Sequence, residues 1–308
     1  MDESEQLKAA MGAMQNSMNQ PAPVAQPTEK INPLAGYYRQ PKIYLDLPSK
    51  GNYYTQGSLD VSEDGRYPVY AMTAKDELMY KTPDALMNGQ ATVEVIKSCI
   101  PSIKDPWKMP SLDVDACLVA IRIATYGSEM DVTTNCPECG TENDHSISLT
   151  NYLEILSNIS YNPVIPVGEL TIHIRPYSYR ELTKTALRTL EQERIFSIVN
   201  DSEMPEDEKI EKFGESFVKL TELTVDIVMG CIAAIDTPTD RVTDQEFIKE
   251  FITNAPKDTF DAISDRVQEL KSAFEFQGQQ VTCSNEECNH EYEMKVAMDQ
   301  ADFFAVRS

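Results

Sequence analysis

Apolar and polar residues follow patterns along this chain that predict short strands and amphipathic helices in alternation. Strict alternation over 42–47 places three apolar side chains on one face of a half-buried strand. A second strand is expected over 169–175. Residues 112–126 are apolar nearly all round, which predicts a central helix ending at Gly127. The patterns therefore favour an α+β fold with a mainly helical body and small β-elements.

Several helix starts carry capping residues. Thr73 with Asp76, and Ser178 with Glu181, have the spacing of capping boxes. Thr243 is expected to cap a later helix in the same way. These signals predict that the second half of the chain is mostly helical, apart from one strand and one hairpin.

A long helix is expected after the acidic stretch 202–209, with Pro205 in its first turn. Another helix, over 260–274, leads toward the end of the chain. The long helix carries an apolar stripe made of Ile210, Phe213, Phe217, Leu220, Thr224, Ile227 and Cys231.

Two β-hairpins carry a pair of cysteines at their turns. The first pair is Cys136 and Cys139, and the second is Cys283 and Cys288. Strand-like, β-branched segments flank each pair, so each turn presents two sulfurs on the same side. Four thiolates are the ligand set of a closed tetrahedral structural zinc site. The spacing therefore predicts one composite zinc ribbon shared by the two hairpins.

Other states of these cysteines remain open at this point: a disulfide within each pair, or reduced thiols without metal. His145 and His290 lie near enough in sequence to substitute as ligands, although four thiolates already complete a tetrahedral shell. The remaining cysteines, Cys99, Cys117 and Cys231, lie in apolar helical patterns and are expected to behave as small hydrophobic residues.

The order of elements repeats along the chain: strand, capped helix, further helices, and finally a cysteine hairpin. We interpret this order as a divergent internal duplication. The expected organisation is an N-terminal arm over 1–30, an α+β half over 31–150 ending in the first cysteine hairpin, and a mainly helical half over 151–308 ending in the second.

The N-terminal arm contains a proline-rich stretch, 21–27, that is incompatible with helix or sheet. It also carries an apolar stripe at helical spacing, which suits a helix that docks on another protein. The alternative is a disordered tail in which the spacing arises by chance. The stripe consists of Leu7, Met11, Met14 and Met18.

Composition narrows the classes of partner. The formal net charge is −23, which repels nucleic acid, and no cluster of basic residues with interleaved aromatics offsets it. No apolar run approaches the length of a membrane span, and the first residues lack the pattern of a signal peptide. We therefore expect a chain made in a reducing cytoplasm, with neither nucleic acid nor membrane as its partner.

Catalytic signatures are missing from the sequence. It contains no nucleophile elbow, phosphate-binding glycine loop or His-Glu-x-x-His helix. Two of the three histidines flank the cysteine hairpins, and His173 lies on a predicted strand. A four-cysteine site also leaves no open coordination position for a catalytic metal. The sequence therefore predicts a protein that is not an enzyme.

The chain resembles the T4-type bacteriophage baseplate protein family over about residues 40–150. The likeness rests on the order of several motifs, and the Phe303-Phe304 pair near the end has a similar character. The motifs are LDLPSKGNY at 45–53, PVYAMTAKDE at 68–77, ACLVAIRIATYG at 116–127 and CPEC at 136–139.

This resemblance implies a structural subunit of a contractile tail, associated with the baseplate hub and located in the virion. It implies no catalytic residue and, as partners, other tail and baseplate proteins in a symmetric assembly of several copies. Two alternatives stay open: a hub assembly chaperone that is absent from the mature virion, and a zinc-ribbon factor associated with nucleic acid.

Deletion of residues 1–30 tests the arm. The truncated chain is expected to keep its thermal unfolding midpoint but to assemble with its partners less well, because the stripe is predicted to contact another protein. A large loss of thermal stability in the isolated protein would instead show that the arm packs on its own chain.

Overall fold

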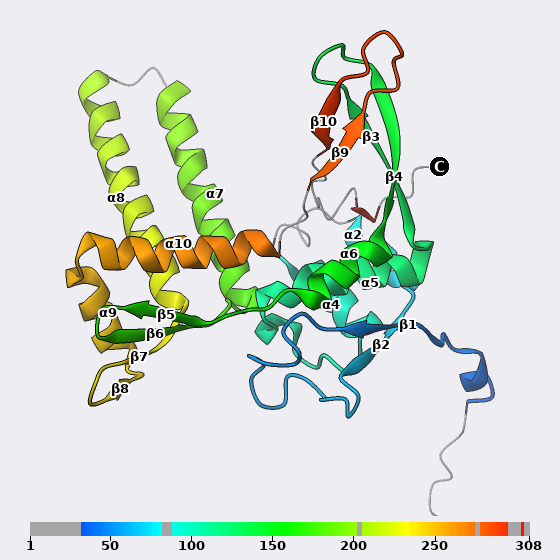
Figure 1. Ribbon diagram of the computed structural model, residues 1–308, viewed down its shortest axis with the longest axis horizontal. Helices are drawn as coiled ribbons and strands as arrows, with labels where there is room; N and C mark the ends of the chain where they lie inside the picture. The colour runs from blue at the N-terminus through cyan, green and yellow to red at the C-terminus, as the bar shows by residue number, and fades with distance from the viewer. Residues whose placement is uncertain (1–31, 82–87, 202–204, 275–277, 295–302, 305–308) are drawn as a thin grey trace, which may run out of the picture. The chain divides into compact units, whose positions relative to one another are not determined.

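The computed structural model describes residues 32–81, 88–201, 205–274, 278–294 and 303–304 (Figure 1). The chain divides into two compact units, 1–39 and 40–308. The described part of the first unit contains one short 3-10 helix, η1 (Ala35–Tyr37). The predicted arm and its apolar stripe lie outside the described residues. All other described elements belong to the second unit, which mixes helices with small antiparallel sheets.

The first hydrophobic core is built on helix α5 (Val114–Tyr126), whose residues are buried on most of its circumference. This confirms the predicted central helix and its end at Gly127, which takes a positive φ of 102°. The predicted first strand is also confirmed. The other elements of this core are β1 (Pro41–Asp46), β2 (Arg66–Tyr70), α2 (Ala74–Tyr80), α4 (Gln90–Cys99), η2 (Pro106–Lys108), η3 (Ser111–Asp113) and α6 (Leu149–Asn158).

The second hydrophobic core lies on a four-stranded antiparallel sheet with strand order β5-β6-β7-β8. The C-terminal part of α8 and helices α9 and α10 cover this sheet (Figure 1). Its elements are β5 (Val164–Val167), β6 (Leu170–Ile174), α8 (Glu206–Gly230), β7 (Ile232–Asp236), β8 (Arg241–Val242), α9 (Gln245–Asn254) and α10 (Lys257–Ala273).

Sequence reasoning missed most of this sheet. Only the strand that became β6 was predicted, and Cys231 was assigned to the long helix, whereas α8 ends at Gly230 and β7 begins at Ile232. The apolar run of β7 directly continues the apolar pattern of α8. Periodicity alone does not separate a short buried strand from the end of a buried helix.

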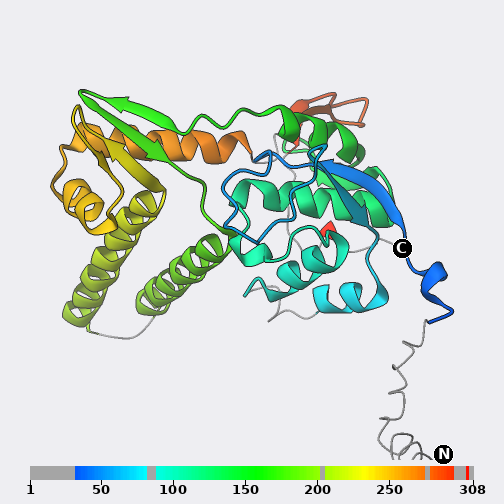
Figure 2. The ribbon, with the colours of Figure 1, turned by 90° about the horizontal axis from the view of Figure 1, so that it is seen from below.

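Helices α7 (Tyr179–Asp201) and α8 run side by side as a long hairpin (Figures 1 and 2). The predicted stripe of α8 is partly wrong. Ile210 and Phe217 are 64% and 68% exposed, whereas Ser216 and Leu223 are buried. Apolar residues are spread over more than one side of this helix, and only its packing partners determine which side becomes buried.

Both predicted capping boxes are confirmed. The Thr73 N–H donates to Asp76 Oδ2 at 2.8 Å, and the Asp76 N–H donates back to Thr73 Oγ1 at 3.3 Å. Ser178 and Glu181 make the equivalent pair at 2.8 and 3.3 Å. Two other starts differ by one position: Asp244 caps α9 instead of Thr243, and α8 begins immediately after Pro205.

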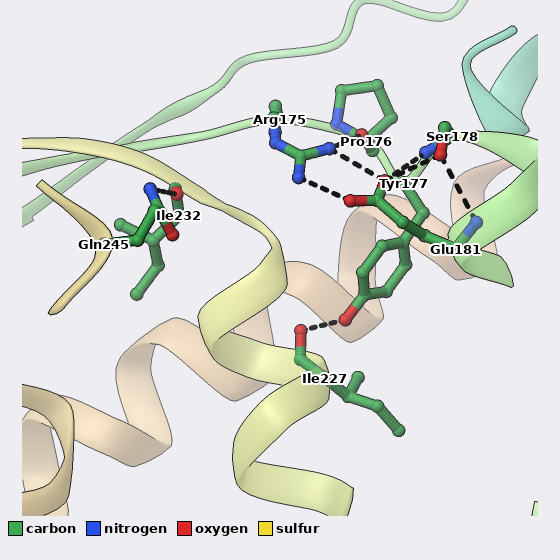
Figure 3. Close-up of polar contacts among 8 residues, drawn as sticks. All are labelled: Arg175, Pro176, Tyr177, Ser178, Glu181, Ile227, Ile232 and Gln245. Carbon is green, nitrogen blue, oxygen red and sulfur yellow. Dashed lines mark hydrogen bonds and ion pairs between the residues drawn. The ribbon is translucent and has the colours of Figure 1, made fainter. Parts of the chain in front are cut away.

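The segment before α7 connects the two cores, and Figure 3 shows its contacts with Glu181 and with Ile227 of α8. The Arg175 guanidinium makes two hydrogen bonds to Glu181, at 2.7 and 3.0 Å, and the Tyr177 hydroxyl donates to the Ile227 carbonyl. On the side of the first core, the Ser111 N–H donates to the Tyr177 carbonyl at 2.7 Å. One short segment thus forms hydrogen bonds with both cores.

The Glu181 carboxylate at this connection remains ionised. Burial acts to raise the pKa of Glu181, but hydrogen bonds from Arg175 and Ser178 outweigh burial and lower the pKa to about 2. The carboxylate therefore stays ionised at all ordinary pH values, as a capping group and an ion-pair partner require.

Asp113 is a fully buried carboxylate that joins the start of α5 to the loop after β1. It accepts hydrogen bonds from the Ser49 N–H at 2.8 Å, the Ser49 hydroxyl at 2.5 Å and the Tyr54 hydroxyl at 3.0 Å. Burial raises the pKa of Asp113 to about 6, although these hydrogen bonds act to lower it. No pattern in the sequence indicates this role of Asp113.

Asp113 predicts a specific pH dependence of stability. Its carboxyl favours the folded state fully below the unfolded pKa of about 4, and this contribution falls as pH rises to about 6. Asp113→Asn should abolish the fall. Between pH 4 and 7 the unfolding free energy of the variant should therefore rise relative to wild type by about 3 kcal/mol.

Urea unfolding across this pH range measures the difference. Glu63→Gln removes an exposed carboxylate and controls for the general loss of one charge. Parallel pH profiles of the wild type and Asp113→Asn would contradict the assignment.

Candidate metal centre

The two cysteine hairpins predicted from the sequence are both present. Strands β3 (Glu129–Asn135) and β4 (Glu142–Ser148) form the first, and β9 (Gln279–Thr282) and β10 (Glu291–Met294) form the second. Both are antiparallel, and their turns lie at the same end of the paired hairpins (Figure 1). Each turn carries one cysteine pair, so the register of each hairpin fixes where its sulfurs lie.

The two turns have corresponding backbone geometry. A residue with positive φ follows the second cysteine of each pair: Gly140 at 73° and Asn289 at 47°. Glycine and asparagine are the residues that adopt this conformation at least cost. The N–H of Gly140 donates to the Cys136 carbonyl at 2.9 Å, and the N–H of Asn289 donates to the Asn285 carbonyl at 3.0 Å. These bonds close each turn around its sulfurs.

The four sulfur atoms form one cluster. All of them lie within 4.8 Å of one another, as predicted for Cys136, Cys139, Cys283 and Cys288. Two separations between the hairpins are 3.9 Å, from Cys136 to Cys288, and 3.6 Å, from Cys139 to Cys283. A tetrahedral zinc with Zn–S bonds of about 2.3 Å places its sulfurs roughly 3.8 Å apart. The arrangement therefore fits one metal ion and not disulfides, whose bond length is about 2 Å.

Asn143 joins the two turns. Its side chain is buried, donates to the Thr141 carbonyl at 2.8 Å and accepts the Ser284 N–H at 2.7 Å. The amide thus connects the backbone of the first turn with that of the second. Sequence reasoning missed Asn143, because an asparagine in a polar strand gives no signal of burial.

Tyr292 makes a second connection between the hairpins. Its hydroxyl lies 2.9 Å from Thr134 Oγ1 and 3.3 Å from His145 Nε2. The His290 ring lies parallel to the Tyr292 ring, with centroids 6.4 Å apart. Both histidines considered as substitute ligands therefore contact Tyr292, and among the described residues the metal-ligand cluster consists of the four cysteines.

The thiols of the cluster differ in acidity. Hydrogen bonds from the Thr141 hydroxyl and N–H lower the pKa of Cys139 to about 6. The pKa of Cys288 is raised to about 12: the His290 N–H acts to lower it, but burial and neighbouring cysteine thiols outweigh that effect. One thiolate thus forms readily at neutral pH. A cation in the cluster would favour ionisation of the others.

The charged side chains of the two hairpins are all acidic. The two hairpins, 129–148 and 279–294, contain no lysine or arginine. All of their carboxylate side chains are exposed: Glu129, Asp131, Glu138, Glu142, Asp144, Glu286, Glu287, Glu291 and Glu293. Such a surface repels the phosphates of nucleic acid.

The third histidine lies outside this centre. His173 Nε2 is 2.7 Å from Asp236 Oδ2, on neighbouring strands of the second core. Asp236 is also paired with Arg241 at 3.3 Å. No other group of metal-ligating side chains comes together in the described part of the chain. Within the same residues, no helix combines the length and apolar character needed to cross a membrane.

Comparison with known proteins gives one match, to a protein family. No curated protein and no solved structure matches the chain. The matching family model is that of the T4 bacteriophage base plate protein, and it aligns with residues 41–305. The match includes both cysteine hairpins and both hydrophobic cores, well beyond the 40–150 region in which the sequence resemblance was noticed. The chain therefore belongs to the T4 bacteriophage base plate protein family.

Proposed function

We propose that this baseplate component acts in the hub region of a contractile tail, where it joins tail proteins and where one structural zinc ion holds its two halves together. Membership of the family is the observation that supports a structural role in the virion tail. The close approach of the four sulfur atoms supports the zinc part of the proposal. A site closed by four cysteines stabilises a fold and leaves no position for substrate, so we propose no catalytic role.

The small size of the ribbon is a further argument for a metal. Its two hairpins comprise only 36 residues, and the hydrophobic cluster at their turns has just three buried members: Cys136, Cys283 and Tyr292. The other ends of the hairpins are anchored in the first core through Met130, Ile147 and Met294, so little apolar burial is left to hold the two turns together. The sulfurs of different hairpins are 3.6 and 3.9 Å apart, too far for disulfides, so a metal is the stabilising element that fits.

The two halves 31–150 and 151–308 are proposed to derive from an internal duplication. Each half contains an antiparallel strand pair, a helix begun by a capping box, further helices and a cysteine hairpin. The corresponding positive-φ residues, Gly140 and Asn289, support the same relation. Under this proposal the zinc lies between equivalent turns of the two halves.

Two alternatives predict different locations or ligands. A hub assembly chaperone would be present in infected cells but absent from mature particles. A zinc-ribbon factor associated with nucleic acid would bind DNA or RNA in a salt-dependent way. The acidic, lysine- and arginine-free surface of the ribbon disfavours the second alternative. Several copies in a symmetric assembly, with partner contacts through the arm residues 7–18, are part of the main proposal.

The zinc proposal predicts one ion per chain. Native mass spectrometry of the wild-type protein should show one zinc, and Cys283→Ser should lose it because a thiolate ligand is gone. Cys99→Ala changes a buried cysteine outside the cluster and should keep the ion. Because both hairpins share the ion, Cys283→Ser should also speed amide exchange in 129–148. Retention of zinc by Cys283→Ser, or unchanged exchange in 129–148, would disprove the shared site.

The location proposal predicts that the protein is present in purified tails at a fixed ratio to other baseplate proteins. Quantitative mass spectrometry of purified mature particles and of infected cells measures this ratio, with a known tail protein as internal reference. Presence in cells together with absence from particles would favour the chaperone. Salt-sensitive nucleic-acid binding by the zinc-loaded protein would favour the zinc-ribbon factor associated with nucleic acid.

A further inference from the structure

A cleft of about 460 Å³ lies between strand β1 and helix α6. Its apolar lining comes from the strand and from α5 and α6, and includes Ile43, Leu45, Ile123 and Leu153. Its volume falls in the range of sites that hold small ligands or short peptide segments. Neither the cysteine cluster nor the contacts between the two cores involve this cleft.

One edge of strand β1 faces the cleft. Among the described residues, β1 pairs only with β2, in a two-stranded sheet. Tyr44 lies opposite Pro68, which has no N–H to donate, so the ladder bonds to β2 belong to the neighbouring residues 43 and 45. The N–H and C=O of Tyr44 therefore point away from β2.

The direction of that free edge is fixed by Ser157 on α6. Its hydroxyl lies 3.3 Å from the carbonyl of Asp46. Asp46 is two residues after Tyr44, so the backbone groups of both residues point to the same edge of the strand. The Lys50 ammonium donates to the Ser157 carbonyl at 2.6 Å. These two bonds close one end of the cleft and show that the outward-facing groups of β1 point toward α6.

The charges around the cleft are balanced, unlike those of the chain as a whole. Lys50 and Arg66 stand beside Asp46 and Glu154 in the lining, whereas the chain carries a net charge of −23. Arg66 and Asp46 are 3.8 Å apart, and both are about half exposed. A partner of negative charge would therefore meet less repulsion here than at the ribbon.

We propose that this cleft binds an extended segment of another baseplate protein, which adds as a third strand to β1. The inference rests on the proposed function in the tail. An exposed strand edge with a helix as the opposite wall selects an extended backbone, because only such a backbone bonds to the outward N–H and C=O groups. Alternate side chains of the segment are apolar, to contact the lining at Ile123 and Leu153.

Other occupants fit less well. A helix is about 10 Å wide and offers no backbone groups to a strand edge. In a second copy of this chain, β1 also lies beside its own helix α6. That helix would prevent the β1 strands of the two copies from pairing edge to edge. A single extended segment enters between strand and helix without either difficulty.

Matched variants test the strand addition. Tyr44→Pro removes the outward N–H while the pairing with β2 needs no bond from it; Tyr44→Phe keeps the N–H and controls for the side chain. Thr150→Arg places a bulky group on the exposed face of the α6 wall, and Thr150→Ser is its control. Thermal unfolding first confirms that all four variants fold.

The readout is incorporation into purified tails, measured against wild type. Tyr44→Pro and Thr150→Arg are expected to fall at least tenfold, and both controls to match wild type. Amide exchange adds a direct measure: the Tyr44 N–H should exchange rapidly in the isolated protein and slowly in tails.

Normal incorporation of folded Tyr44→Pro and Thr150→Arg, or equally rapid exchange at Tyr44 in both states, would overturn the inference and leave the proposed function standing. Absence of the wild-type protein from tails would overturn the proposed function, and this inference with it.

Discussion

The meeting of the two cysteine turns is the constraint on which the rest of the structure depends. The sulfurs of Cys139 and Cys283 are 144 positions apart in the chain and 3.6 Å apart in space. Closing a loop of this length costs about 5 kcal/mol of chain entropy. A structural zinc bound by thiolates contributes about 10–16 kcal/mol, so the proposed ion is more than sufficient to hold the closure.

Both hairpins of the ribbon are attached to the first hydrophobic core. Strand β4 runs directly into α6, whose first residue, Leu149, is buried in that core. At the other end, Met294 of β10 is also buried in it. Both hairpins are therefore anchored in the same core, although their sequences lie far apart. The second core is linked to the first by the segment around Tyr177, whose carbonyl accepts a backbone hydrogen bond from Ser111 of η3.

Local signals in the sequence predicted what local chemistry determines. The capping boxes, the helix end at Gly127 and both cysteine hairpins follow from residues within a few positions of one another. The exposed side of α8, the strand β7 and the buried Asn143 depend instead on what packs against them. Phe217 is exposed because α7 and the sheet cover another side of its helix. No periodicity in one segment contains that information, and the same is true of Asp113 and its partners.

Charge limits where this protein contacts its neighbours. With a net charge of −23 and an acidic ribbon, like copies repel one another at distances up to the Debye length of about 8 Å. Contacts between acidic components therefore need either a basic partner or a surface where charge is balanced and backbone groups are exposed. The edge of β1 meets the second condition, since Lys50 and Arg66 offset Asp46 and Glu154 there. The acidic ribbon and the charge-balanced edge of β1 thus differ in the partners that their charges favour: the ribbon repels phosphates, whereas the edge leaves an acidic partner unopposed.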